Sequence, residues 1–352
     1  METYCWEVGR ALARQGHEVH IFGGEGGVAR NSDVKLIALP YTPRHRFPNL
    51  GTRFRKLAER LSFAKHAKTI LAAGDYDAVV VNKPYDFPVL SWLKRKGYKG
   101  VTAIRSGGTD FYLGDRLFAN AVDLWLSSSA YNAAQVEARY GRPVTVIHNG
   151  VDPQRFSPQA ADASIRTRFG IPSDAVTIVS AGRLVGWKGY HLIVEALRAL
   201  PAMHYLVIGG GEERQRLEAL AQEAGVADRV HFAGEVTHKD LPAFLCTGNV
   251  FVQPSIGEEA FGISVVEAMS CGLPVLASNQ GGLREIVQPG ETGQLLPVGD
   301  MSAWQTALAA MTEASARNAL GTAGRERVLA KFTWEGNARH LLALLASHGE
   351  GV

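Results

Sequence analysis

The sequence predicts an α/β protein built from two Rossmann-like domains, each with a parallel sheet. Short apolar segments of strand composition alternate with amphipathic helical segments along all 352 residues, which is the pattern of parallel sheets with crossover helices. Turn-forming residues gather between Asn149-Gly150 and Ser157-Pro158 and divide that pattern into two halves. With 46% hydrophobic and 20% charged residues, the composition fits a globular protein of about two domains.

The expected elements follow one another in regular order. The chain opens on a helical pattern with Tyr4, Val8 and Leu12 on one side. In the first half, strands are expected at 18–22, 34–38, 78–81, 100–104, 124–127 and 144–147. In the second half they are expected at 177–181, 204–208, 230–233, 250–253 and 274–277. Helices are expected between them, among others at 190–200, 212–224 and 263–270.

Bulk features exclude several classes of protein. No apolar run reaches the ~18 residues that a membrane-spanning helix needs. The three cysteines, Cys5, Cys246 and Cys271, are far apart and form no CxxC pair. They fit reduced thiols better than a disulfide framework or a zinc site. We therefore expect a cytoplasmic protein.

Positive charge is concentrated in the first half. Residues 30–105 hold sixteen Lys and Arg against five Asp and Glu, although the net charge of the chain is only +3. Residues 53–71 also read as an amphipathic helix with an apolar face of Phe54, Leu57, Ala58, Leu61, Ala64 and Leu71. Two interpretations of residues 44–68 stay open. The segment either contacts an anionic surface on the inner face of the cell membrane or is the solvated face of a core helix. No nucleic-acid partner is expected.

Two cations follow the first strand of the second half. Arg183 and Lys188 come directly after an apolar strand and before a helix, so they lie at the carboxyl end of that strand. Fixed cations at this place can hold a diphosphate and stabilise the negative charge of a leaving group. Surface loops also carry Lys and Arg often, so position alone does not decide between a diphosphate site and a solvated loop with two surface bases.

A glycine run follows the second strand of the same half. Gly209, Gly210 and Gly211 end the strand and open a helix. The dinucleotide fingerprint GxGxxG requires a further glycine where Arg214 stands, so a nicotinamide site is not supported. A tight strand-to-helix turn explains the glycines equally well.

Two glutamates surround the start of a later helix. Glu259 precedes the helix that begins near Gly262, and Glu267 lies about a turn and a half into it. The free amides of residues 262–264 and the helix dipole favour a phosphate. Both carboxylates can therefore reach one ligand, the first towards a sugar and the second towards ribose hydroxyls. The dipole also favours acidic residues near a helix start without any ligand.

These motifs together resemble the retaining glycosyltransferases of family GT4. The match includes Gly182-Arg183 with Lys188-Gly189, the spacing Glu259-x7-Glu267, and Gly272 with Pro274, and it extends from about residue 4 to about residue 345. The resemblance implies a GT-B fold with two Rossmann-like domains facing across a cleft. Residues 1–155 would form the acceptor domain, completed by a C-terminal helix at about 335–350, and residues 156–334 the donor domain. Family members begin with a strand and a Gly-Gly turn that this chain lacks before its first helix.

The resemblance also implies roles for individual residues. Arg183, Lys188 and Glu259 would be catalytic. The residues expected to bind the nucleotide sugar are Gly182, Gly209, Val236, Phe261, Gly262, Ile263, Ser264 and Glu267. No metal and no cofactor are expected, because the two cations and the helix amides would replace a metal and no DxD motif stands beside these segments.

The acceptor half departs from the family pattern. Many members carry a histidine before Gly-Thr-Asp at the end of the fourth strand, where this chain has Arg105 and Ser106 before Asp110. The preceding strand ends at Asn82, where a histidine is also frequent. Asn82, Arg105 and Asp110 are therefore the expected acceptor-side residues, and a histidine-dependent step is not expected here.

The resemblance implies transfer of a hexose from a nucleotide diphosphate sugar to a hydroxyl-bearing acceptor, a sugar or a lipid-linked molecule, with retention. Such a reaction belongs to glycan, glycolipid or cell-envelope biosynthesis. Two alternatives stay open. A sugar-nucleotide 2-epimerase would need further histidines and acids at the sugar. A non-catalytic nucleotide-sugar-binding protein would keep the phosphate cations but could lose Glu259.

Overall fold

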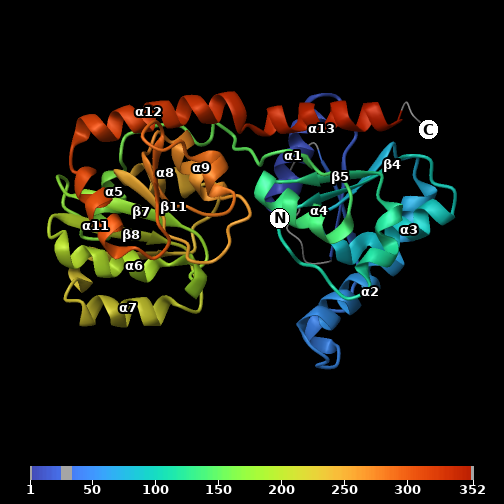
Figure 1. Ribbon diagram of the computed structural model, residues 1–352, viewed down its shortest axis with the longest axis horizontal. Helices are drawn as coiled ribbons and strands as arrows, with labels where there is room; N and C mark the ends of the chain where they lie inside the picture. The colour runs from blue at the N-terminus through green and yellow to red at the C-terminus, as the bar shows by residue number, and fades with distance from the viewer. Residues whose placement is uncertain (1, 25–33, 350–352) are drawn as a thin grey trace. The chain divides into compact units, whose positions relative to one another are not determined.

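The computed structural model describes residues 2–24 and 34–349, which form two units (Figure 1). Unit 1 comprises Met1–Asn149 and Trp334–Val352, and unit 2 comprises Gly150–Thr333. Residues 150–155 lie in unit 2 and not in the first domain as expected. The reason is that Val151 N donates to Phe332 O at 2.9 Å, which ties this segment to the end of the second unit.

Unit 2 is built on one parallel sheet of six strands in the order β12-β11-β10-β7-β8-β9. The strands are β7 (Val176–Ala181), β8 (Met203–Ile208), β9 (Val230–Gly234), β10 (Val250–Gln253), β11 (Val275–Ser278) and β12 (Gly293–Leu296). The first five were predicted to within two residues. The prediction missed β12, because it is short, begins with a glycine and is followed directly by Pro297.

Helices cover both faces of this sheet. One face carries α6 (Tyr190–Ala196), α7 (Arg214–Glu223) and α11 (Met301–Ala310); the other carries α5 (Ala163–Arg168), α8 (Leu241–Cys246), α9 (Ile263–Ser270), α10 (Leu283–Ile286) and α12 (Ala314–Lys331). Successive residues of a strand point into the cores on opposite faces of the sheet: Ile178 packs with α6, and Val179 packs with α8 and α9. Strands buried on both faces explain the continuous apolar runs in the sequence.

Unit 1 holds two parallel sheets among its described residues. One pairs β1 (His20–Gly24) with β2 (Lys35–Leu39). The other has β3 (Ala78–Val81), β4 (Val101–Ser106), β5 (Leu124–Ser127) and β6 (Thr145–Val146) in that order. All six predicted strands are present, shifted by two residues or fewer.

The helices of unit 1 also pack on both sides of its strands. α1 (Glu2–Arg14) and α13 (Trp334–Gly349) share one core with β4 and β5, and the rings of Tyr4 and Trp334 meet edge to face with centroids 6.0 Å apart. The opposite core is formed with α2 (Thr52–Ala73), α3 (Phe87–Arg95) and α4 (Ala130–Tyr140). None of the helices in the described ranges is long and apolar enough to cross a bilayer.

The predicted apolar face of α2 is only partly a core face. Ala67 and Leu71 are buried, but Phe54 and Leu61 remain 40% and 44% exposed. In Figure 1 the blue first turns of α2 protrude from the rest of unit 1, so side chains there lack a core to pack against. The helix forms as predicted, and its first half does not bury the face that the pattern indicates.

Candidate functional site

The predicted catalytic residues of unit 2 follow the two strands at which the strand order changes direction. β7 and β10 are neighbours in the sheet, although about seventy residues separate them in the chain. In open parallel sheets, ligands bind at the carboxyl ends of the strands at such a point. Arg183 follows β7 and Glu259 follows β10, so the fold brings the two segments to the same edge.

Lys188 and Glu259 form the central contact of the site. Lys188 Nζ donates to Glu259 Oε2 at 2.8 Å, and each side chain is 12% exposed. A short 3₁₀ turn, Gly186–Lys188, places the lysine, and its ammonium also lies 4.7 Å from the Trp187 ring centroid. A pair of this kind keeps a cation and a carboxylate available side by side without either being an isolated buried charge.

Polar side chains that the sequence analysis missed hold this pair. Gln253 Nε2 and Ser255 Oγ both lie 3.3 Å from Glu259 Oε2, where they donate, and Ser264 Oγ donates to Gln253 Oε1 at 3.2 Å. The sequence contained one signal for them, a glutamine at the end of an otherwise apolar strand. In the structure this glutamine is fully buried. A buried amide at a strand end needs partners, and here they belong to the site.

Arg183 and Tyr190 each carry a polar group that makes no hydrogen bond or ion pair within the described residues. Arg183 is exposed at the end of β7, and no hydrogen bond or ion pair holds its guanidinium within the described ranges. The Tyr190 hydroxyl is buried and has no hydrogen-bond partner in the same ranges. Burial, and then the nearby Glu259 charge, raise the pKa of Tyr190, so this hydroxyl stays a neutral donor.

Glycines let three strand ends meet closely. Gly182 N donates to Ile208 O at 2.9 Å, and Gly209 N donates to Gly234 O at 2.8 Å. Gly209 has a φ of 133°, and a Cβ there would overlap the Gly182 carbonyl. Only glycine fits this position, so the structure supports the tight-turn interpretation of Gly209.

The start of α9 presents main-chain amides. Gly262, with a φ of 114°, precedes the helix, and the amides of Ile263 and Ser264 have no intrahelical acceptor. The Phe261 side chain is in the core and contacts Phe332 edge to face with centroids 5.9 Å apart. The side chains of Ile263 and Val236 likewise pack against that core. The Phe261 side chain is therefore withdrawn from any ligand, while those of Ile263 and Val236 are only partly buried.

Glu267 belongs to a second set of hydrogen-bonded side chains in unit 2. Its side chain is nearly buried, and His238 Nε2 lies 2.7 Å from Glu267 Oε1. His238 Nδ1 lies 3.0 Å from Arg155 Nη1. The sequence analysis singled out neither His238 nor Arg155, because both lie in loops without a motif.

Two of the three predicted acceptor-side residues lie together in unit 1. Arg105 is the next-to-last residue of β4. Its buried guanidinium carbon lies 4.0 Å from the Tyr4 ring centroid, and its Nη2 donates to Asn149 Oδ1. Asn82 follows β3 and donates to Cys5 Sγ at 3.1 Å. Burial lowers the pKa of Arg105, and its Nε has no partner in the part of the chain that the structure describes. Asn82 Oδ1 is also buried without a partner there.

Asp110 lies in a different ionic group. Lys56 Nζ donates to Asp110 Oδ1 at 2.8 Å, and Lys83 Nζ donates to Oδ2 at 2.5 Å. Burial alone would raise the pKa of Asp110, but the hydrogen bonds from the two lysines outweigh it and hold the pKa below its usual value. The carboxylate therefore fastens the loop after β4 to α2.

This pairing predicts a pH-dependent contribution to stability. Because the folded-state pKa is lowered, the stabilisation is fully present above the unfolded pKa of 3.8 and is lost as the pH falls through the folded value. We expect Asp110→Asn to lower the free energy of unfolding at pH 6 by about 1 kcal/mol or less, after allowance for solvent screening. Denaturant titrations of both proteins from pH 6 to pH 3 should show that difference shrink. Asp75→Asn, an exposed control, should show none; a constant difference for Asp110→Asn would contradict the ionic account.

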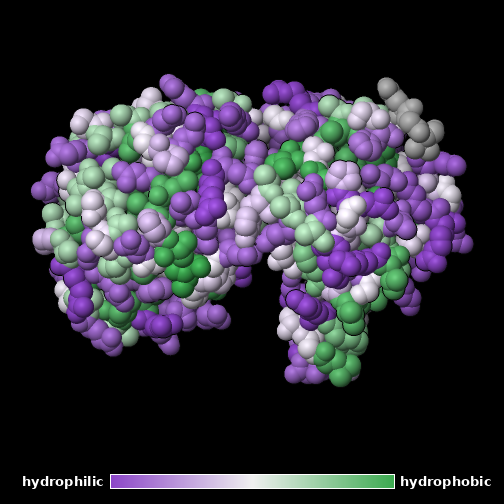
Figure 2. Space-filling view, in the orientation of Figure 1, coloured by the Kyte–Doolittle hydropathy of each residue, from purple (hydrophilic) through white to green (hydrophobic). Residues whose placement is uncertain are grey.

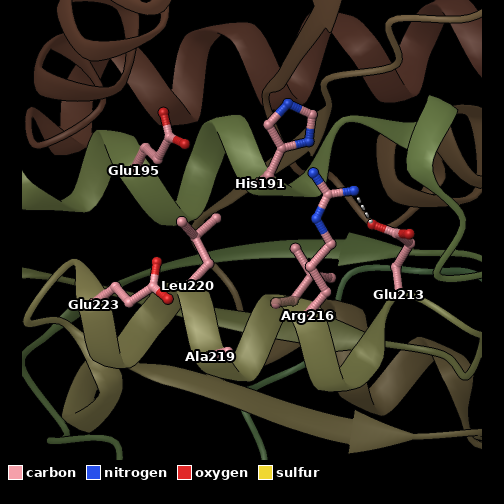
Figure 3. Close-up of a pocket in the computed structure, with 8 residues that line it drawn as sticks. His191, Glu195, Glu213, Arg216, Ala219, Leu220 and Glu223 are labelled. Atoms are coloured by element: carbon pink, nitrogen blue, oxygen red, sulfur yellow. Dashed lines mark hydrogen bonds and ion pairs between the residues drawn. The ribbon is translucent and has the colours of Figure 1, made fainter.

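A separate groove lies between α6 and α7 (Figure 3). It holds about 300 Å³ and is lined by His191, Glu195, Glu213, Arg216, Leu217, Ala219, Leu220 and Glu223. None of the predicted site residues lines it, and two of its lining residues, Arg216 and Glu213, form an ion pair at 3.2 Å. Among the described residues, no group of three or more His, Cys, Asp or Glu could hold a metal ion.

The comparisons with known proteins agree with this fold. The model for glycosyl transferases group 1 matches residues 162–327, and the model for glycosyltransferase family 4 matches residues 1–155. The chain is 30% identical to a D-inositol 3-phosphate glycosyltransferase of Xylanimonas cellulosilytica, over 98% of this chain and 91% of that protein. It is 31% identical to a GDP-mannose-dependent alpha-(1-6)-phosphatidylinositol monomannoside mannosyltransferase of Mycolicibacterium smegmatis, over 67% of this chain and 65% of that one.

Solved structures share the architecture. A sucrose-phosphate synthase of Thermosynechococcus elongatus superposes with a TM-score of 0.84 at 26% identity, covering 99% of this chain and 94% of that one. HepE of Anabaena, solved in complex with UDP-glucose, has the same fold with a TM-score of 0.79 at 19% identity, over 97% of this chain and 95% of that chain. This chain belongs to the family 4, group 1 glycosyltransferases, which confirms the resemblance, the GT-B fold and the transferase class predicted from its sequence.

Proposed function

We propose that this glycosyltransferase moves a hexose from a nucleoside diphosphate sugar to an acceptor hydroxyl with retention of the anomeric configuration. The observation that carries the proposal is the Lys188–Glu259 pair at the carboxyl ends of β7 and β10, which joins the turn after β7 to the loop that leads to the start of α9. A cation and free helix amides suit a diphosphate, and a carboxylate beside them suits sugar hydroxyls.

Each residue then has a definite part in the reaction. Arg183, Lys188 and the amides at residues 262–264 stabilise the charge of the leaving diphosphate. Glu259 accepts from sugar hydroxyls, and Glu267 accepts from ribose hydroxyls. The bond from the anomeric carbon to the phosphate oxygen breaks while the bond to the acceptor oxygen forms on the same face. The leaving phosphate oxygen takes the acceptor proton, so no histidine is needed.

A panel of sugar nucleotides tests this proposal. The protein is incubated with UDP-, GDP- and ADP-hexoses, and release of nucleoside diphosphate is measured with and without candidate acceptors. We expect one donor to be consumed and an α-linked donor to give an α-linked product by nuclear magnetic resonance of the anomeric carbon. A β-linked first product would contradict retention, and release of no nucleotide from any donor would contradict the donor class.

Metal independence is a second expectation. The cations and amides of the site perform the charge stabilisation that a divalent ion would otherwise supply. Activity should therefore survive an excess of EDTA, measured as initial rates of nucleotide release before and after dialysis against the chelator. Loss of activity that Mg²⁺ or Mn²⁺ restores would contradict the assignment of Arg183 and Lys188.

We further propose an acceptor from glycolipid or cell-envelope biosynthesis, used at the inner face of the cell membrane. Two relatives are named for an inositol phosphate and for a phosphatidylinositol mannoside. In unit 1, Leu50 is 70% exposed at the start of α2, near the exposed Phe54 and Leu61. Figure 2 shows hydrophobic residues among hydrophilic ones at the tip of the α2 protrusion. An apolar tip with bases around it suits an anionic bilayer.

The ion pairs of unit 1 decide which bases can serve this contact. Lys56 is paired with Asp110, and Arg60 donates to both oxygens of Asp86. Arg55 donates to the main-chain oxygens of residues 47 and 48. Three exposed bases of the segment have no such partner among the described residues: Arg46, Arg53 and Lys65.

Vesicle binding should therefore depend on those three exposed bases. We expect the protein to co-sediment with acidic vesicles and not with neutral ones, and the binding to weaken with salt, since charges are screened over ~10 Å at 0.1 M. Changing Arg46, Arg53 and Lys65 to Glu should abolish sedimentation. The same change at Arg95, Lys96 and Lys99, which are also exposed bases of unit 1, is the matched control and should retain most of it. Equal losses of vesicle binding in both triple variants would show that binding depends only on net charge and not on the α2 segment.

A further inference from the structure

The orientation of the Glu267 carboxylate depends on a residue from another segment. Glu267 is 5% exposed, and within the described ranges the one hydrogen bond of its carboxylate comes from His238, in the loop after β9. A carboxylate removed from water needs such a partner. α9 fixes the position of the Glu267 main chain, while His238 fixes where the carboxylate points.

The contact with Arg155 settles which atoms of His238 donate. Arg155 Nη1 lies 3.0 Å from His238 Nδ1, and a guanidinium nitrogen can only donate. Nδ1 is therefore the acceptor, and the imidazole is the neutral form with its proton on Nε2. That proton is donated to Glu267 Oε1 at 2.7 Å. Glu267 stays an acceptor, with Oε2 open to donors from a ligand.

The segment that carries Arg155 is fastened to the same helix as Glu267. The ring of Phe156 lies 5.1 Å from that of His238, centroid to centroid. Ser270 Oγ, on α9, donates to Phe156 O at 2.6 Å. The loop with His238, the segment with Arg155 and Phe156, and α9 thus form one closed set of contacts in unit 2. A set closed in this way leaves the imidazole little freedom to turn.

We propose that His238 is a positioning residue that holds Glu267 for the two ribose hydroxyls of the donor and so makes the site selective for ribonucleotides. The inference rests on the proposed function, since it requires a nucleoside diphosphate in unit 2. A vicinal diol donates two hydrogen bonds, which a carboxylate accepts well only when its plane is fixed. With Oε1 fixed by the imidazole, Oε2 and the second lone pair of Oε1 face the diol.

Calorimetric titration of the full chain tests the proposal. UDP, GDP and ADP first identify the nucleoside diphosphate that wild-type protein binds tightest, and its 2′,3′-dideoxy form serves as the second ligand. Three variants are compared with wild type. His238→Phe keeps a ring against Phe156 but loses the donor. His238→Gln keeps one donor and one acceptor. His191→Phe removes an imidazole from the α6–α7 groove and is the matched control.

The expected result is an effect that depends on the ribose. His238→Phe should weaken the ribonucleotide about tenfold, as for loss of one hydrogen bond to a charged group, and change the dideoxynucleotide less than about twofold. His238→Gln should recover most of the affinity, and His191→Phe should match wild type. Equal weakening of both ligands by His238→Phe would overturn the inference while leaving the nucleotide site in place. Absence of any nucleotide binding by wild-type protein would overturn the proposed function itself.

Discussion

Lys188→Ala should lower the turnover number by about a hundredfold to a thousandfold, which is the effect of removing one preorganised donor at a developing oxyanion, about 2.7–4 kcal/mol. The lysine is nearly buried, and its ammonium lies 2.8 Å from Glu259. The substitution therefore removes a fixed charge from the site and also leaves a carboxylate unpaired there. Both changes act against a departing diphosphate.

Steady-state rates under saturating donor check this expectation. Lys331→Ala, which removes an exposed lysine at the end of α12, is the matched control and should keep wild-type turnover. Arg183→Ala should lower turnover in the same direction, and less steeply because Arg183 is exposed. Unchanged turnover of Lys188→Ala would show that the lysine is a structural partner of Glu259 and not part of the reaction.

Glu259→Gln should change turnover and product binding differently. The carboxylate accepts hydrogen bonds from Lys188, Gln253 and Ser255, and we propose that it meets the transferred sugar. Loss of its charge should lower turnover by about a hundredfold, the scale of losing a charge-assisted contact in the transition state. Lys188 would then lack its counter-ion, so a nucleoside diphosphate without sugar should bind at least as tightly as in wild type.

Two measurements on the same variant separate these effects. Turnover of the sugar nucleotide reports the contact with the sugar, and calorimetric titration with the nucleoside diphosphate reports the phosphate site. Glu223→Gln, which neutralises an exposed acid of α7, should leave both unchanged. If Glu259→Gln weakens binding of the nucleoside diphosphate as much as it slows turnover, Glu259 supports the local fold and does not contact the sugar.

The sequence contained enough to predict the strands and to single out the two residues at the centre of the candidate site. Apolar runs such as Val250–Gln253 are buried on both faces, so their pattern is strong, and eleven expected strands are present. Lys188 and Glu259 were expected to meet the same ligand, and the structure brings them into direct contact. Their motifs are local in sequence, and parallel strands bring successive strand ends to one edge without further information.

Other features depend on contacts that no local pattern contains. His238 is held by contacts with Arg155 and Glu267, which are far from it in the chain. The charges of α2 read as a free basic face, yet Lys56 and Arg60 are bound by Asp110 and Asp86 from other segments. Asp110 was grouped with Asn82 and Arg105 because the family pattern places all three on the acceptor side, and in the structure its carboxylate pairs with two lysines. Tertiary packing decided each of these cases.

A crystal structure of the full chain grown with its nucleoside diphosphate sugar tests the central claim most directly. The account predicts the diphosphate against Lys188, Arg183 and the amides at the start of α9. It predicts the ribose on Glu267, with the His238 hydrogen bond intact, and the sugar beside Glu259. Density for the nucleotide in the groove between α6 and α7, or anywhere away from the carboxyl ends of β7 and β10, would contradict it.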